Sequence, residues 1–132
     1  MALNNEIAVE FLDVTYRINR RHLVDKLNFK VFQGEVLVLL GRSGSGKTTT
    51  MKLINNLLTP SSGEVIVMGK STTQWNSIQL RRKIGYVIQE IGLFPHFTVE
   101  QNVGLVPKLE GWEGDRIKSR VRQLLELVNL DP

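Results

Sequence analysis

The feature that most constrains this chain is the stretch GRSGSGKTTT, residues 41–50, which lies between two segments of expected regular structure. The apolar run EVLVLL precedes it, and the helix-like run TTTMKLINNLL begins inside it. Glycines at positions 41, 44 and 46 permit backbone angles that a Cβ atom would forbid, so successive N–H groups can turn towards one point. A strand, a glycine-rich loop and a helix N-terminus in this order predict a cradle for an anion.

The spacing within the stretch makes this prediction more specific. It reads G-x-x-x-x-G-K-T from Gly41 to Thr48, which is the P-loop pattern. Lys47 is expected to reach the β- and γ-phosphates of a nucleotide, and the hydroxyl of Thr48 is expected to bind Mg²⁺, a cation that prefers oxygen ligands. The alternative is a glycine-rich surface turn beside an exposed lysine, which the flanking strand and helix argue against.

Composition narrows the class of protein. The chain has 132 residues, 42% of them hydrophobic, which fits one globular domain rather than two. VLVLL is the longest aliphatic run, far below the roughly 18 to 20 residues of a membrane-spanning helix. No signal peptide is visible at the start, and the absence of cysteine fits the cytosol. We therefore expect a cytoplasmic protein.

The net charge of +4 raises the question of nucleic-acid binding. Basic runs occur at residues 17–22, 80–85 and 116–122. They are scattered, alternate with acidic residues and lack the interleaved aromatic residues or recognition helix of a nucleic-acid interface. We interpret them as a solvated basic surface and expect no nucleic-acid partner.

The periodicity of apolar residues predicts an α/β fold. Alternation at residues 7–11 and again at 27–31 predicts two antiparallel strands before the P-loop. The continuous run at residues 36–40 predicts a strand that is buried on both faces, as in a parallel sheet. Further strands are expected at EVIVMGK and IGYVIQ, with a short helix at NSIQLRRK. Apolar residues at helical spacing from Ile117 to Val128 predict an amphipathic helix near the end.

The stretch IGYVIQEIGLFPHFTVEQNV, residues 84–103, together with LRRK before it, resembles the ATP-binding subunits of ABC transporters. The resemblance covers nearly the whole chain and includes the P-loop and LLTPSSGEV. Within that family, YVIQEIGLFPH followed by VPKLEGW is most similar to importers of osmoprotectants such as glycine betaine, carnitine and choline. The resemblance implies ATP and Mg²⁺ as ligands and, in the intact form, ATP hydrolysis coupled to import.

The resemblance also implies an organisation and a set of partners. Residues 1–89 would form the amino-terminal part of the P-loop NTPase core with its antiparallel β subdomain, and residues 90–132 the start of an α-helical subdomain. The partners implied are a second ATP-binding subunit and an integral membrane permease, with the protein peripheral on the cytoplasmic face of the inner (plasma) membrane. Gln89 matches the glutamine that begins the Q-loop, and its amide could orient a metal-bound ligand.

Two departures from the family pattern leave alternatives open. The usual spacing places the aromatic residue that stacks on adenine at Ile18, and Tyr16 could substitute only if the strand shifted. The Walker B carboxylates, the switch histidine and the signature motif are not found in these 132 residues. We therefore expect a truncated, amino-terminal half of the ATPase domain, with a non-catalytic nucleotide-binding fragment as the alternative. Whether the chain itself is an enzyme stays open.

The candidate residues fall into two groups. The expected metal ligands are Thr48 and Gln89, and no catalytic residue is assigned. The expected nucleotide-binding residues are Gly41, Arg42, Ser43, Gly44, Ser45, Gly46, Lys47, Thr48, Thr49 and Ile18.

Overall fold

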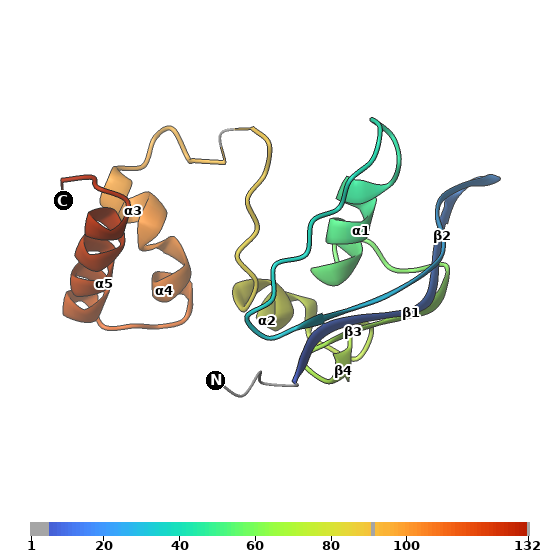
Figure 1. The fold of residues 1–132 in the computed structure, drawn as a ribbon. Coiled ribbons are helices and arrows are strands. Elements are labelled where there is room, and N and C mark those ends of the chain that lie inside the picture. Colours follow the sequence, from blue (N-terminus) through green and yellow to red (C-terminus); the bar gives the residue numbers. More distant parts are fainter. Residues whose placement is uncertain (1–5, 91, 132) are drawn as a thin grey trace. The chain divides into compact units, whose positions relative to one another are not determined.

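A computed structural model of the chain describes residues 6–90 and 92–131, and the chain divides into two compact units, one ending at Gly85 and the other beginning at Tyr86. The first unit contains an antiparallel sheet of four strands in the order β2-β1-β3-β4. The strands are β1 (Ile7–Ile18), β2 (Arg21–Phe32), β3 (Ser62–Val67) and β4 (Lys70–Ser71). The two predicted antiparallel strands before the P-loop are therefore confirmed, and they form the long hairpin in Figure 1.

The alternating residues of the hairpin form the centre of the sheet. Phe11 of β1 lies opposite Phe29 of β2 and Val65 of β3, and the two phenylalanine rings stack with their centroids 4.4 Å apart. Because these residues are paired across the strands, the alternating apolar side chains of β1 and β2 contribute to the same core. The buried core cluster of this unit comprises Phe11, Val14, Val24, Leu53, Val65, Val67 and Leu80.

Two helices complete this core. Helix α1 (Lys47–Ile54) contributes Leu53, and helix α2 (Ser77–Arg82) contributes Leu80. Helix α2 begins where the side chain of Asn76 accepts hydrogen bonds from the backbone N–H groups of residues 78 and 79, both at 3.1 Å. The predicted start of the helix after the P-loop and the short helix at NSIQLRRK are both confirmed.

Two predicted strands are absent from the structure. Residues 36–40 form no strand, and Val36 and Leu40 are 87% and 89% exposed. Residues 84–89 likewise form no strand, and Val87 is 92% exposed. Both predictions were wrong for the same physical reason: a parallel strand needs a hydrogen-bonded neighbour, and within residues 6–90 and 92–131 no strand pairs with either segment.

The second unit is helical. It contains α3 (Val99–Val103), α4 (Leu105–Leu109) and α5 (Gly114–Leu127). Thr98 and Gln101 form a reciprocal capping box at the start of α3. The predicted amphipathic helix is confirmed as α5, whose Val121 and Leu125 are buried. Val128, the last residue of the predicted apolar stripe, lies after the helix and is exposed.

Candidate functional site

The loop between residues 41 and 46 takes the backbone form that its glycines allow. Gly44 and Gly46 have φ angles of +80° and +94°, in the left-handed region that an L side chain rarely adopts. A Cβ atom on Gly41 would meet the Oγ of Ser45 at 2.5 Å, and one on Gly46 would overlap the backbone carbonyl oxygen of Leu23. The loop therefore requires glycine at positions 44 and 46 for conformation and at 46 also for space, whereas a side chain at 41 would displace the side chain of Ser45.

Helix α1 begins directly behind this loop. Gly46 is its N-cap and offers no side-chain cap, and the first turn contains no acidic residue. The first intrahelical bonds come from Thr50, whose N–H and Oγ1 both donate to the carbonyl of Gly46, at 2.8 and 3.0 Å. Within the described part of the chain, the N–H groups of Lys47, Thr48 and Thr49 have no acceptor. Three backbone donors and the positive end of the helix dipole are thus available to an anion.

The side chain of Lys47 lies across the loop. Its ammonium donates to the carbonyl oxygens of Gly41 and Arg42, both at 2.8 Å, and to the Oγ of Ser45 at 3.3 Å. An ammonium group has three donors, so an anion that binds Nζ must replace or share one of these acceptors. The longest contact, to Ser45, is the weakest of the three.

The predicted nucleotide-binding residues 41–49 lie together on this loop and the first turn of α1 (Figure 1). Arg42, Ser43 and Thr48 are exposed, so their side chains are accessible to a ligand. The glycine cradle and the open N–H groups fit the triphosphate of a nucleotide, and the hydroxyl of Thr48 fits one ligand position of a Mg²⁺ ion. Gln89 is exposed and belongs to the second unit, and its role as a metal ligand stays a prediction.

No cluster of three or more His, Cys, Asp or Glu side chains that could hold a metal ion occurs among residues 6–90 and 92–131. Likewise, no helix in the described residues is long and apolar enough to cross a membrane.

The two residues considered for stacking on adenine, Tyr16 and Ile18, occupy different environments. Tyr16 is half-buried and packs against the core cluster, whereas Ile18 ends β1 and is 50% exposed. The pairing between β1 and β2 is irregular on both sides of Tyr16. The regular alternation that would place both side chains on one face is therefore interrupted at Tyr16, and Ile18 is the more exposed of the two. Which of them stacks on a base stays a prediction.

Sequence reasoning missed the contact between the hairpin and the P-loop. Leu23 and Val24 of β2 lie against Gly46 through the Leu23 carbonyl oxygen and the Val24 side chain. No local pattern announces this contact, because it joins residues that are more than twenty positions apart.

The sequence profile of the ABC transporter family matches residues 24–132. The chain belongs to the ABC transporter family. This match confirms the resemblance that residues 84–103 indicated. The P-loop NTPase fold is confirmed as well, because this chain is similar in structure to solved ABC cassettes. One such structure, cbiO1 from Clostridium perfringens, part of the ABC transporter complex cbiONQ, is 27% identical, with a TM-score of 0.83 over 95% of this chain and 51% of its own.

A second solved ABC cassette, a dimer in a post-hydrolysis state bound to ADP and Pi, is 29% identical, with a TM-score of 0.79 over 93% of this chain and 58% of its own. Among curated ABC proteins, the choline transport ATP-binding protein of Bacillus subtilis is 46% identical over 96% of this chain and 33% of its own length. The osmoprotectant import ATP-binding protein of Salmonella typhimurium is 51% identical over 82% of this chain and 28% of its own length. The chain thus spans about a third of these curated relatives.

Proposed function

We propose that this chain binds the triphosphate of Mg²⁺-ATP on residues 41–49, as the P-loop part of an ABC transporter ATP-binding subunit. One observation carries the proposal: two left-handed glycines, three open N–H groups and the Lys47 ammonium lie together on the loop and the first turn of α1. In a P-loop, such donors stabilise the negative charge of the phosphates, and the helix dipole adds to them. The family match and the similarity to a cassette bound to ADP and Pi support this assignment.

The roles of the individual residues follow from their chemistry. Lys47 supplies a charged donor to the β- and γ-phosphates, and the backbone of Gly44 to Thr49 supplies neutral donors. Thr48 offers its hydroxyl to Mg²⁺, which neutralises charge on the phosphates during phosphoryl transfer. Gln89 is the second proposed metal ligand and belongs to the second unit.

We further propose that the whole protein couples ATP hydrolysis to the import of an osmoprotectant, probed best by choline, glycine betaine and carnitine. It would act as a pair of ATP-binding subunits with an integral membrane permease, at the cytoplasmic face of the membrane. The support is the identity of 46% and 51% to a choline transport and an osmoprotectant import ATP-binding protein. Residues 1–89 and 90–132 would belong to the core and the helical subdomain, respectively.

The test of the binding site is a titration of the chain with a fluorescent ATP analogue and with inorganic tripolyphosphate. Lys47→Ala should weaken both ligands about tenfold or more, since a charged hydrogen bond to phosphate contributes roughly 1.5–3 kcal/mol. Lys52→Ala removes the same charge from the last turn of α1 and should change neither affinity by more than about twofold. Equal weakening by both variants would show a general charge effect and would refute the site.

A further inference from the structure

A pocket lies on the outer face of the antiparallel sheet, away from the core. Phe11 of β1 and Val65 of β3 are paired and buried, so the neighbouring pair, Glu10 and Ile66, lies on the opposite face. Around this second pair is a pocket of about 430 Å³, which we name the outer pocket. Its polar lining includes Glu6, Glu10 and Gln33, and its apolar lining includes Ile7, Ile66 and Met68.

Two irregular places in the backbone form the outer pocket. The β1–β2 register shifts between Ile7 and Val9, so that Ile7 lines the pocket whereas Val9 packs against the core. A two-residue turn at Met68 and Gly69, with φ angles of +51° and +73°, joins β3 to β4. The N–H of Met68 donates to the carbonyl of Ala8 at 2.9 Å, which ties this turn to the bulge in β1.

The two carboxylates of the outer pocket each keep one oxygen without a partner. Oε1 of Glu10 accepts from Nζ of Lys30 at 2.8 Å, and the Glu10 side chain is only 16% exposed. Oε2 of Glu6 accepts from Nε2 of Gln33 at 2.7 Å. Within residues 6–90 and 92–131, the second oxygens of Glu6 and Glu10 accept no hydrogen bond. Because a carboxylate only accepts, these oxygens favour a positively charged donor.

The two lysines near the outer pocket do not neutralise it. Lys30 shares Glu10 from outside the lining, and the ammonium of Lys70 lies 5.1 Å from the centre of the Trp75 ring. Among the described residues no cation lines the outer pocket, although the chain carries a net charge of +4. The pocket is therefore an acidic place on a basic protein.

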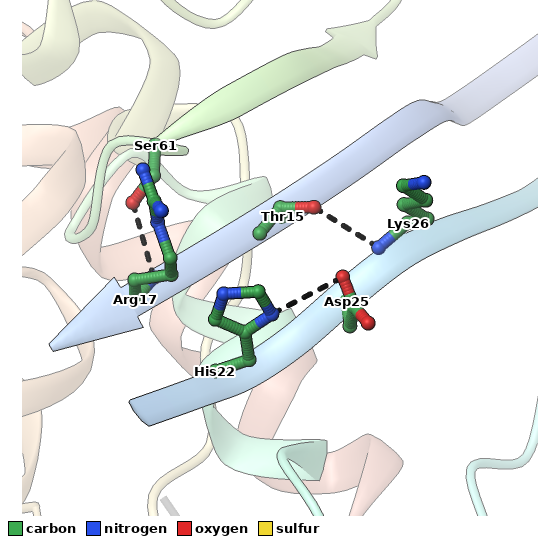
Figure 2. Close-up of polar contacts among 6 residues, drawn as sticks. All are labelled: Thr15, Arg17, His22, Asp25, Lys26 and Ser61. Atoms are coloured by element: carbon green, nitrogen blue, oxygen red, sulfur yellow. Dashed lines mark hydrogen bonds and ion pairs between the residues drawn. The ribbon is translucent and has the colours of Figure 1, made fainter. Parts of the chain in front are cut away.

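The basic end of the same hairpin is too distant to compensate. Figure 2 shows Arg17, His22 and Lys26 near the tip, where the carboxylate of Asp25 lies 3.3 Å from Nδ1 of His22. Arg17 and Glu10 belong to the same strand, and seven residues of extended chain span about 23 Å. This distance exceeds the Debye length of about 8 Å at physiological ionic strength. The outer pocket therefore keeps its own attraction for a cation.

Exposed apolar side chains border the outer pocket. Phe32, which pairs with Ile7, is 41% exposed, and Met68 is 50% exposed. Leu12 follows Glu10 on the outer face of β1 and is 39% exposed. Covering such a rim is favourable, and it extends beyond the space that one small amine would fill.

We propose that the outer pocket is a docking site for a partner protein that presents a lysine between two apolar residues. The aliphatic stem of this lysine lies along Ile66 and Met68, and its ammonium donates to the free oxygens of Glu6 and Glu10. The flanking apolar residues cover the exposed rim. Charge complementarity and the apolar rim carry this inference, which does not depend on nucleotide binding at the P-loop.

The test is a titration of the ¹⁵N-labelled 132-residue chain, followed by NMR, with the peptide acetyl-Leu-Lys-Leu-amide. Amide signals of Ile66, Met68 and Gly69 should shift. A peptide with norleucine in place of lysine keeps the stem and loses the charge, so it should bind about fivefold or more weakly. n-Butylammonium keeps the stem and the charge without the flanking residues, so it should bind about tenfold more weakly.

Variants of the chain locate the charge that the peptide contacts. Glu10→Gln keeps the shape of the side chain and should weaken the lysine peptide about fivefold. Glu64→Gln is the matched control, because Glu64 pairs with Leu12 on the same face but does not line the pocket, and it should change the affinity by less than about twofold. Lys30→Met removes the cation that shares Glu10 and should tighten the peptide about threefold. Circular dichroism checks that each variant retains the sheet.

Each result either supports or overturns the inference. Equal binding of the lysine and norleucine peptides, or signal shifts confined to other residues, would overturn it. Equal weakening by Glu10→Gln and Glu64→Gln would show a general charge effect and would also overturn it. Binding of n-butylammonium as tight as that of the peptide would make the pocket a site for small amines instead. Tripolyphosphate should bind Glu10→Gln and the unmodified chain equally, so failure here leaves the proposed function intact.

Discussion

The hairpin strands and residues 36–40 are both rich in apolar side chains, yet they end in opposite environments. β1 and β2 pair along most of their length and bury Phe11, Val14 and Val24. In residues 36–40, Val36 and Leu40 are almost fully exposed and the segment forms no strand. Hydrophobicity alone therefore does not decide which of these segments becomes a sheet.

The difference lies in where each segment finds its hydrogen-bond partners. β1 and β2 are joined by a two-residue turn, so each strand supplies the other's neighbour and alternating side chains share one core. A parallel strand needs neighbours that arrive through long connections, and a continuous apolar run needs cover on both faces. Residues 36–40 and 84–89 have neither such neighbours nor cover on both faces within the described residues. Local pairing is settled by local sequence, whereas central parallel strands depend on the rest of a sheet.

The largest expected effect contrasts a leucine of the core with one of the open segment. Leu53→Ala should lower the free energy of unfolding by about 2–5 kcal/mol, because its side chain is fully buried and its removal leaves a cavity. Leu40→Ala removes the same atoms from an exposed position and should change stability by less than about 0.5 kcal/mol. Urea denaturation followed by circular dichroism measures both. Similar losses in the two variants would show that residues 36–40 are buried after all.

The next effect tests how closely β3 approaches β1. Gly63 has a φ of +77°, and a Cβ there would overlap the carbonyl oxygens of Leu12 and Asp13. Gly63→Ala should cost more than about 2 kcal/mol, since strain of the backbone and displacement of β1 add together. Gly69→Ala is the matched control, because its φ is +73° but nothing lies within 4 Å, and it should cost about 1 kcal/mol.

A cost for Gly63→Ala no larger than that for Gly69→Ala would mean that β1 and β3 are not in the close register described. Thermal unfolding of the two variants, followed side by side, decides between these outcomes.

The third prediction concerns residues 94–98, which have no regular secondary structure but are held by hydrogen bonds to one side chain. Asn102 holds residues 94–98: its Oδ1 accepts from the N–H of Phe94 at 2.8 Å, and its Nδ2 donates to the carbonyls of Phe94, Phe97 and Thr98 at 3.0–3.2 Å. Asn102→Ala should destabilise this loop locally by about 1–3 kcal/mol, because several polar groups lose their partner. Amide hydrogen exchange at Phe94 and Phe97 should then speed up about tenfold or more.

Asn102→Asp refines this test, because it keeps the acceptor for Phe94 and removes the amide donors. Protection should persist at Phe94 and fall at Phe97. Exchange rates that stay at the unmodified values in both variants would show that the loop is held by other contacts.

The smallest expected effect on stability concerns the open segment itself. Val36→Lys should leave the free energy of unfolding within about 0.5 kcal/mol, because the side chain is already in solvent. It should also reduce self-association in sedimentation velocity, since a charge on an unpaired apolar segment opposes edge pairing. Thr59→Lys adds the same charge at an exposed polar position and controls for net charge. A loss of more than about 2 kcal/mol in Val36→Lys would place residues 36–40 in a buried strand.

The local part of the site could be predicted from the sequence. The glycine spacing, the helix start at Lys47 and the hairpin all appear where the pattern placed them, because backbone angles, caps and two-residue turns depend on adjacent residues. The surroundings of the two candidate adenine-stacking residues could not be predicted in this way. The alternation of side chains along a strand predicts that Tyr16 and Ile18 lie on one face of β1. Because the pairing of β1 with β2 is irregular at Tyr16, Tyr16 packs against the core whereas Ile18 is exposed.

The sequence by itself determined the P-loop, the family and the order of hairpin, loop and helix, since each rests on residues close together in the chain. Only the tertiary structure decided which apolar segments are covered, and only it placed Leu23 of the hairpin against Gly46 of the loop. The physical reason is that burial and contact between distant residues depend on which strands find neighbours. A side chain's environment is set by the packing of the whole unit rather than by its own short stretch of sequence.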